Sequence, residues 1–343
     1  MIDPIAAAGQ DYATLTTQAA RQAFAATQLF GADDKLYLFL KEISSNGNTQ
    51  TVDVIYLASS IFFYTNPELI KLLLDPHFEN QESGHYPHKR AVHDLGTHYP
   101  NATCYPAEDD EPMPLEECGN NIIMVLSYVQ RSGNTDYIKQ HYTILQQWAE
   151  YLIEDSFNPA KQLSTDDVAG HLVNQFNLAL KGIIGIEAMS QLSSLIGETF
   201  DAQNYMTITH DYIAKWQTLG INSEASPPHA ILNHSNASTW GLLYNLYNDK
   251  RLNLSLVPQE MYDMQSAFYP TVKKNYGVPL DTRNRYYTKS DWGLFCAAIA
   301  SEEARGMFIS DLARFVNETP TSKPFTDLYQ KSDATFPPVD IQG

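Results

Sequence analysis

The chain has 343 residues, of which 22 are Lys or Arg and 40 are Asp or Glu, and its formal net charge at pH 7 is −18. This charge excludes a protein that holds nucleic acid or an anionic membrane surface through clustered basic side chains. Hydrophobic residues make up 43% of the chain, which excludes disorder over most of its length. The longest apolar run, residues 122–126, is far shorter than the roughly 20 residues of a membrane-spanning helix. We therefore expect a soluble, folded protein.

The first part of the chain is predicted to contain two helices on either side of a short hairpin. The helices are expected at about residues 11–30 and 67–75. Between them, residues 35–43 and 51–56 have the character of strands, and the turn-forming residues 44–48 join them. We predict a small β-hairpin near the N-terminus.

From residue 114 onward, apolar residues recur at helical spacing in paired segments. Leu115, Cys118, Ile122 and Val125 lie on one stripe of a helix, and Gly133 marks a stop before the next helix. The same arrangement repeats along the rest of the chain. The predicted pairs are 115–129 with 138–152, 174–196 with 200–219, 238–248 with 258–276, and 290–300 with 303–316.

The first helix of a pair is more apolar than the second. Residues 178–189 are apolar on nearly every side, whereas residues 201–220 alternate with polar positions. A helix that is apolar all round must be enclosed, and an amphipathic helix faces solvent on one side. We therefore predict inner and outer rings of helices in a single domain over residues 1–343. The expected fold class is mainly all-α, an (α/α)6 toroid of the six-hairpin, glycosidase-like type with a small β-hairpin insertion.

The long segment 79–114 concentrates residues that are suited to a functional site. It holds four of the ten His in the chain, beside Asp94 and the acidic residues 108–111. A loop of this length in a compact domain is functional or disordered, and its aromatic residues favour function. The acidic run lacks the spacing of a calcium-binding loop. The four histidines are His85, His88, His93 and His98.

Adjacent carboxylates stand at the start of two predicted inner helices. Glu116 and Glu117 open one of them, and Asp166 with Asp167 precede the other. A catalytic role is one interpretation, and the ordinary placement of negative charge at a helix N-terminus is the other.

Polar residues also line one face of an otherwise apolar helix. Asn174, Asn177 and Lys181 have the spacing i, i+3 and i+7, and such groups need partners inside a protein. They indicate a lined pocket or, alternatively, a hydrogen-bond network that ties helices together. Two later loops offer Arg and aromatic side chains for a substrate carboxylate or a sugar face, with a salt-bridged surface as the alternative. The residues of these loops are Trp240, Tyr244, Asp281, Arg283, Arg285, Tyr286, Tyr287, Lys289, Asp291 and Trp292.

The cysteines and the glycosylation sequons bear on the cellular location. Cys104, Cys118 and Cys296 form no CxxC pair and have no His at metal-ligand spacing, so no metal site is expected. At most one disulfide can form, and its pairing stays open. The N-terminus has no secretory signal pattern, yet the number of sequons indicates a secreted glycoprotein whose signal is absent from this chain. The sequons begin at Asn101, Asn233, Asn236, Asn253 and Asn317.

Several long motifs resemble one family. The strings HDLGTHYPNAT, DDEPMPLEECGN, QLSTDD, NLALKG, YGVPLDTR and YTKSDW are similar to those of the fungal glutaminase A-like proteins, and the resemblance covers nearly the whole chain. It implies a six-hairpin helical domain, which follows a β-rich N-terminal region that this chain lacks. It also implies extracellular hydrolysis of the glutamine side-chain amide to glutamate and ammonia, with no organic cofactor. The chain departs from the family pattern at Arg90, at Val168 and in its last residues.

General chemistry assigns roles to the candidate residues. The chain has no GxSxG elbow, so we favour attack by water with the help of paired carboxylates. The substrate is then glutamine or, alternatively, a sugar, and the oligomeric state stays open. A glycoside hydrolase, or a non-catalytic carbohydrate-binding or immune-active secreted protein, are the competing hypotheses. The acid/base candidates are Asp94, Glu116, Glu117, Asp166 and Asp167, and the substrate-binding candidates are His98, Asn120, Asn177, Lys181, Trp240, Arg283 (for the α-carboxylate) and Trp292.

Overall fold

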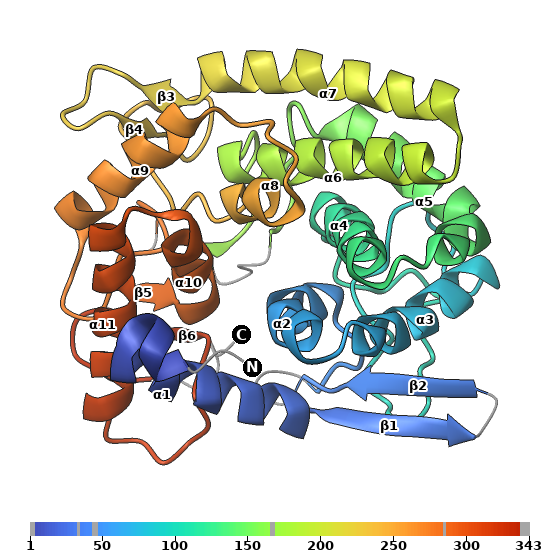
Figure 1. Ribbon diagram of the computed structural model, residues 1–343, viewed down its shortest axis with the longest axis horizontal. Coiled ribbons are helices and arrows are strands. Elements are labelled where there is room, and N and C mark those ends of the chain that lie inside the picture. The colour runs from blue at the N-terminus through green and yellow to red at the C-terminus, as the bar shows by residue number, and fades with distance from the viewer. Residues whose placement is uncertain (1–3, 33–34, 43–46, 165–168, 284–285, 337–343) are drawn as a thin grey trace. The chain divides into compact units, whose positions relative to one another are not determined.

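The computed structural model describes residues 4–32, 35–42, 47–164, 169–283 and 286–336 (Figure 1). The chain divides into two compact units. The larger unit is formed by Ala26–Trp216, and the other by Met1–Ala25 together with Gln217–Gly343. Each unit is described by itself, and the single domain predicted over residues 1–343 stays a prediction. Among the described helices, none combines the length and the apolar character that crossing a membrane requires.

The larger unit is built from helical hairpins and one β-hairpin. The predicted pairs around residues 133 and 197 are confirmed, and Gly133, with a φ of 72°, makes the first of these turns. Asn134 then caps the next helix by accepting a hydrogen bond from the Tyr137 amide. The elements are β1 (Thr27–Ala32), β2 (Lys35–Leu40), α2 (Val52–Thr65), α3 (Glu68–Glu82), α4 (Pro114–Ser132), α5 (Thr135–Asp155), α6 (Phe176–Leu195) and α7 (Thr199–Leu219).

Helices α4 and α6 form the core of this unit. Every residue of α4 from position 115 to 129 is buried, and α4 contacts α2, α3, α5 and α6. Figure 1 shows α4 and α6 beside each other, and glycines allow this close approach. A Cβ atom on Gly185 would lie 3.3 Å from Gly119 Cα, and one on Gly182 would lie 1.9 Å from Ser156 Oγ. The prediction that the first helix of these pairs is enclosed is confirmed.

The predicted β-hairpin of residues 35–43 with 51–56 is wrong in one of its strands. β2 pairs with β1 instead, in the antiparallel register Thr27↔Leu40 to Ala32↔Lys35, so the first helix ends at Ala25. Residues 52–56 begin α2, because their β-branched side chains belong to a longer helical repeat that buries Ile55, Ser59, Phe62 and Phe63.

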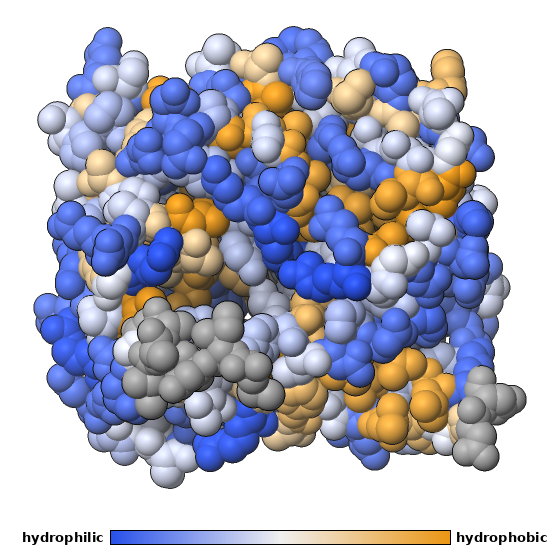
Figure 2. Space-filling view, in the orientation of Figure 1, coloured by the Kyte–Doolittle hydropathy of each residue, from blue (hydrophilic) through white to orange (hydrophobic). Residues whose placement is uncertain are grey.

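This β-hairpin carries exposed apolar side chains. Leu29, Phe30 and Leu36 are exposed, and hydrophobic colour gathers over β1 and β2 in Figure 2. Helix α3 is also longer than predicted, because it continues through Pro76 to Glu82.

The second unit holds the remaining helices around a small apolar core. Leu15, Leu312, Phe315 and Tyr329 are buried together in it. The predicted pair 290–300 with 303–316 is confirmed. The prediction of a helix over residues 238–248 is wrong up to residue 245, because Leu242 donates a backbone hydrogen bond to the Leu280 carbonyl there and α8 begins only at Leu246. The elements are α1 (Pro4–Ala25), β3 (Ile221–Asn222), β4 (His229–Ala230), α8 (Leu246–Leu252), α9 (Gln259–Val272), β5 (Tyr287–Lys289), α10 (Ser290–Ile299), α11 (Glu302–Glu318) and β6 (Leu328–Gln330).

Candidate functional site

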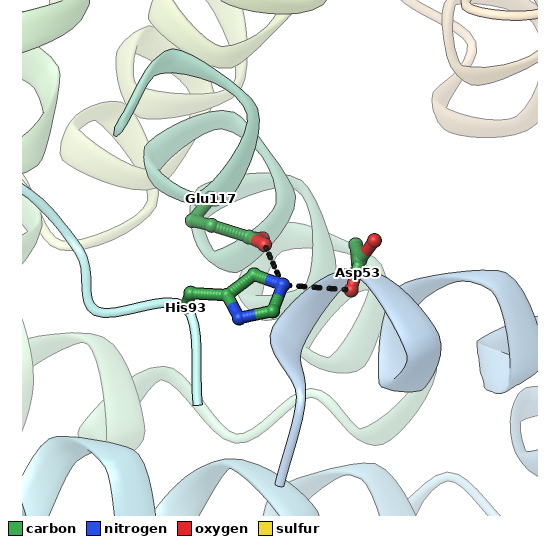
Figure 3. A group of neighbouring side chains, drawn as sticks. All are labelled: Asp53, His93 and Glu117. Carbon is green, nitrogen blue, oxygen red and sulfur yellow. Dashed lines mark ion pairs between the residues drawn. The ribbon is translucent and has the colours of Figure 1, made fainter. Parts of the chain in front are cut away.

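Three buried polar side chains meet where two helices of the larger unit begin. Asp53 lies in the first turn of α2, Glu117 lies in the first turn of α4, and His93 lies on the segment between α3 and α4 (Figure 3). His93 Nε2 is 3.8 Å from Asp53 Oδ1 and 4.0 Å from Glu117 Oε1. We call Asp53, His93 and Glu117 the buried triad.

Backbone hydrogen bonds hold the histidine segment against both helices. The Val52 amide at the start of α2 donates to the His93 carbonyl at 2.8 Å, and the Leu95 amide donates to the Thr49 carbonyl at 2.9 Å. On the other side, the Ala91 amide donates to Cys118 Sγ of α4 at 3.2 Å. The segment therefore keeps His93 between the two carboxylates.

Asp94 lies directly behind the histidine. Its carboxylate contacts His93 Nδ1 at 2.8 Å and accepts hydrogen bonds from Asn48 Nδ2 at 3.0 Å, the Gly96 amide at 2.6 Å and the Tyr105 hydroxyl at 2.7 Å. With so many donors, Asp94 is suited to orienting the imidazole so that Nε2 points into the triad. Burial opposes ionisation of Asp94, but the hydrogen bond with His93 holds the pKa of this carboxyl below its usual value.

A second polar group supports Glu117 from inside the core. Lys181 Nζ of α6 is 3.1 Å from Glu116 Oε1 and donates to Asn120 Oδ1 at 2.6 Å. Asn120 Nδ2 in turn donates to Glu117 Oε2 at 3.0 Å. Lys181 also lies over the ring of Tyr56, 3.6 Å from its centroid, and is completely buried.

The charges of these groups shift one another's ionisation. Burial opposes a charge on His93, but the hydrogen bond to Asp94 and the charges of Asp53 and Glu117 raise its pKa to about 10. Burial and then the nearby charge of Asp53 raise the pKa of Glu117 well above its usual value. Burial also opposes a charge on Lys181, yet Glu116 raises the pKa of this lysine. Because both acidic residues of the triad lie in the first turns of helices, the helix dipoles favour negative charge here.

The triad also has the donor types of a metal site. One imidazole nitrogen and two carboxylate oxygens lie within 4.8 Å of one another, and all three residues are buried. No other group of this kind occurs among the residues that the structure describes. The sequence analysis, which expected no metal site, did not bring these three residues together.

Comparison with known proteins agrees with the motifs of the sequence. Residues 9–340 match the model of the Glutaminase A six helical-hairpin domain. The chain belongs to this family. It is 59% identical over 335 residues to Glutaminase A of Aspergillus oryzae. This alignment covers 98% of this chain and 48% of that protein. It is 36% identical over 414 residues to a probable glutaminase of Arthroderma benhamiae, with 96% of this chain and 48% of that protein covered.

The glutaminase A family resemblance and the mainly helical, six-hairpin fold class are therefore confirmed. The chain spans about half the length of the curated relatives that it matches.

The structure brings several of the predicted site residues together. Glu117 is part of the buried triad, Asp94 contacts its histidine, and Asn120 contacts its glutamate. Glu116 and Lys181 form the buried ion pair behind Asn120. Of the polar residues predicted on one helix face, Lys181 ties α6 to α4, as the interpretation of a hydrogen-bond network between helices expects, and Asn174 lies before the start of α6.

Other predicted site residues of the larger unit are not part of the buried triad or lie outside the residues that the structure describes. His98 is exposed, and its ring Nδ1 lies 3.5 Å from the Thr97 hydroxyl. Asn177 is half-buried on α6. Asp166 and Asp167 fall outside the described residues.

The predicted residues of the second unit make local contacts. The Arg283 guanidinium pairs with Asp281, with Nη2 at 2.7 Å and Nε at 3.0 Å from Oδ2. Trp292 is buried and stacks on Tyr244, with ring centroids 4.1 Å apart. Trp240 is half-buried and meets Phe268 edge to face. Their roles in substrate binding stay predictions.

Sequence reasoning missed Asp53 and did not select His93. Residues 51–56 were predicted as a strand, so Asp53 was not recognised as a carboxylate at the start of a helix. His93 was named among four loop histidines, but no local pattern separates it from the exposed His98. The three cysteines, whose pairing stayed open, are buried and carry free thiols.

Proposed function

We propose that the chain hydrolyses the side-chain amide of L-glutamine to glutamate and ammonia, and that the buried triad is the reaction site. Membership of the glutaminase A family supports the reaction, and the names of the two relatives support the substrate. The observation that carries the site is the convergence of Asp53, His93 and Glu117 from three separate segments on one buried point. Buried polar groups without full pairing are costly to a fold, so such a cluster is typical of a functional site.

Glu117 is the residue best placed to move protons. Its Oε2 is held by Asn120, while its Oε1 is buried, has no hydrogen-bond partner and faces His93 Nε2. In the proposed reaction, Oε1 takes a proton from water as the water oxygen bonds to the amide carbon, and the carbonyl electron pair moves onto its oxygen. The same proton then passes to the amide nitrogen, the carbon–nitrogen bond breaks, and ammonia leaves as the carbonyl re-forms.

The other two members of the triad serve this transfer. Asp53 places a second negative charge near Glu117, which makes Glu117 a stronger base. His93, oriented by Asp94, presents Nε2 as a donor to the oxygen that becomes negative in the tetrahedral intermediate.

The experiment measures ammonia released from L-glutamine by the purified chain. We expect Glu117→Gln to lower kcat at least about 100-fold, because general acid and base groups contribute about 10²- to 10⁴-fold. The matched control is Glu187→Gln, which changes a glutamate that is equally buried but lies outside the triad and pairs with Gln191. Absence of ammonia release by the folded chain, or full activity of Glu117→Gln, contradicts the proposal.

The competing hypotheses give different outcomes in the same experiment. A glycoside hydrolase releases sugar from an oligosaccharide and no ammonia from glutamine. The carboxylate oxygens of Asp53 and Glu117 lie within 4.8 Å of each other, closer than the roughly 6.5–9.5 Å of inverting glycosidases and near the roughly 5–5.5 Å of retaining ones, so this spacing argues against an inverting mechanism alone. A non-catalytic binding protein shows heat of binding to an oligosaccharide and turnover of neither substrate.

An extracellular location is part of the same proposal. The side chains of four sequon asparagines are exposed and open to glycosylation, whereas Asn233 is half-buried and accepts a hydrogen bond from the Ser235 hydroxyl. Expression through a eukaryotic secretory pathway, followed by enzymatic removal of N-glycans, measures the mass at each site. An unmodified secreted chain contradicts this part. The exposed sites are Asn101, Asn236, Asn253 and Asn317.

A further inference from the structure

We infer that the buried triad is a binding site for a divalent transition-metal ion, coordinated by His93 Nε2, Asp53 Oδ1 and Glu117 Oε1. The effect of the ion on catalysis rests on the proposed function, whereas its binding does not. A suitable probe is Zn²⁺, because it binds both imidazole nitrogen and carboxylate oxygen, and three protein ligands leave a fourth position for water.

The spacing of the three donor atoms supports shared coordination. Nε2 lies 3.8 and 4.0 Å from the two carboxylate oxygens, and these separations are too long for hydrogen bonds. Ligands about 2.1 Å from one tetrahedral ion are about 3.4 Å apart. The two carboxylate oxygens lie within 4.8 Å of each other, so side-chain movements on the order of an ångström would bring the three donors onto one ion.

The surroundings of His93 are those of a metal ligand. A ligating histidine commonly donates its other ring N–H to a carboxylate, which fixes the tautomer and the ring orientation. The contact of His93 Nδ1 with Asp94 provides this arrangement, and Asn48, Gly96 and Tyr105 hold Asp94 in place. With the proton on Nδ1, Nε2 offers its lone pair to the ion.

The local charge favours a cation. Asp53, Asp94 and Glu117 bring three carboxylates around a single imidazole, and the nearby Lys181 is already paired with Glu116. Glu117 Oε1 is buried without a hydrogen-bond partner and is aimed at the other donors (Figure 3). Burying negative charge without compensation is costly, and a divalent ion removes this cost.

Binding of the ion has a direct consequence for the proposed reaction. Glu117 Oε1 is the atom that takes the proton from water, and coordination to a cation makes this oxygen a much weaker base. The ion and the reaction therefore compete for the same atom, and Zn²⁺ inhibits ammonia release with a half-inhibitory concentration that follows its dissociation constant.

Binding is tested on the whole chain, stripped of metal by a chelator and then titrated with ZnCl₂ in a calorimeter. We expect one tight site per chain. His93→Gln and Asp53→Asn each remove that site, and circular dichroism establishes that at least one of these variants is folded. Asp94→Asn weakens it about 10- to 100-fold, as for an outer partner of a ligand.

The matched control is His141→Gln. His141 is also buried and pairs with a carboxylate, Glu82, at 2.8 Å, but it belongs to no three-donor group among the described residues. This variant keeps the tight site. Absence of stoichiometric Zn²⁺ binding, or equal binding by folded His93→Gln or Asp53→Asn, overturns the inference.

Activity separates the inference from the proposed function. Tight Zn²⁺ binding that depends on the triad in a chain that releases no ammonia supports the metal site and contradicts the proposed function. Ammonia release without tight Zn²⁺ binding supports the function and overturns the metal site. Faster release on saturation with Zn²⁺ overturns the inferred competition.

Discussion

Lys181 Nζ donates to Asn120 Oδ1 at 2.6 Å and thereby fixes which end of the Asn120 amide faces Glu117. With its oxygen held by Lys181, the amide can present only its nitrogen to Glu117 Oε2. The lysine sits on α6, and Asn120 and Glu116 both sit on α4. The packing of these two helices thus determines how the glutamate of the triad is held.

The buried ion pair of Lys181 with Glu116 makes a prediction about stability. We expect Lys181→Met to lower the free energy of unfolding by about 3–5 kcal/mol, because it leaves Glu116 buried without its cation. Adding Glu116→Leu should restore most of this loss, since the charge itself is then removed. Urea denaturation of the two variants and the unmodified chain measures the effect. A double variant no more stable than Lys181→Met contradicts the interpretation.

The same double variant predicts an effect on catalysis. Its stability is restored, but Asn120 is no longer oriented, so Glu117 is held less firmly and kcat for glutamine falls by on the order of tenfold. Ammonia release and KM are measured beside a surface control, Lys215→Met, which removes an exposed ion pair with Asp211. Unchanged kcat in the double variant would show that Lys181 serves the fold alone.

Two glycines on helices predict opposite effects of the same substitution. In Gly182→Ala, the new Cβ meets Ser156 Oγ at 1.9 Å and Ser156 Cβ at 2.6 Å, so we expect a loss of about 1–3 kcal/mol in unfolding free energy from overpacking. In Gly306→Ala, the Cβ at this exposed position of α11 meets nothing within 4 Å, and higher helix propensity should add up to about 1 kcal/mol. Thermal and urea unfolding compare the two, and equal shifts would contradict the close packing of α6.

His77 predicts a pH dependence of stability. It is buried on α3, contacts the Gln50 carbonyl through Nε2, and burial lowers its pKa to about 4, although nearby Asp94 acts in the opposite direction. Since this value lies below the unfolded pKa of 6.5, the unfolded chain takes up the proton first as the pH falls. The stabilisation is complete above pH 6.5 and is lost between pH 6.5 and 4.

The cost at pH 5 relative to pH 7 is about 2 kcal/mol. His77→Gln keeps a donor for the Gln50 carbonyl but does not titrate. Between pH 7 and pH 5, the unfolding free energy of this variant should therefore fall by about 2 kcal/mol less than that of the unmodified chain. Chemical denaturation of both proteins at the two pH values measures the difference. An identical change in both contradicts the assignment.

The sequence pattern predicted the helices best where an apolar repeat was long. Helices α4, α5, α6 and α7 follow spacings of three and four residues, and Gly133 marks a turn through its positive φ, a property of one residue. Short segments were less certain from the pattern. Residues 51–56 are rich in β-branched side chains, and only packing against α4 turns them into the start of α2.

The residues of the candidate site also differ in how far the sequence alone predicts them. Lys181 stood out because a polar side chain in an apolar helix needs partners, and Glu117 stood out because it follows Glu116 at the start of a predicted helix; both features are readable from the helix pattern alone. Asp53 and His93 did not stand out, because their importance depends on which segments the fold brings together.

By itself, the sequence determined the family, the mainly helical class and the identity of the residues that carry charge into the core. These properties follow from local periodicity and from motifs, and each of these signals lies within a short stretch of the chain. Only the tertiary structure decided that Asp53, His93 and Glu117 share one buried point, that Asp94 lies behind the histidine, and that Lys181 orients Asn120. Each of these depends on long-range hydrogen bonds and helix packing, and no stretch of the chain encodes such contacts alone.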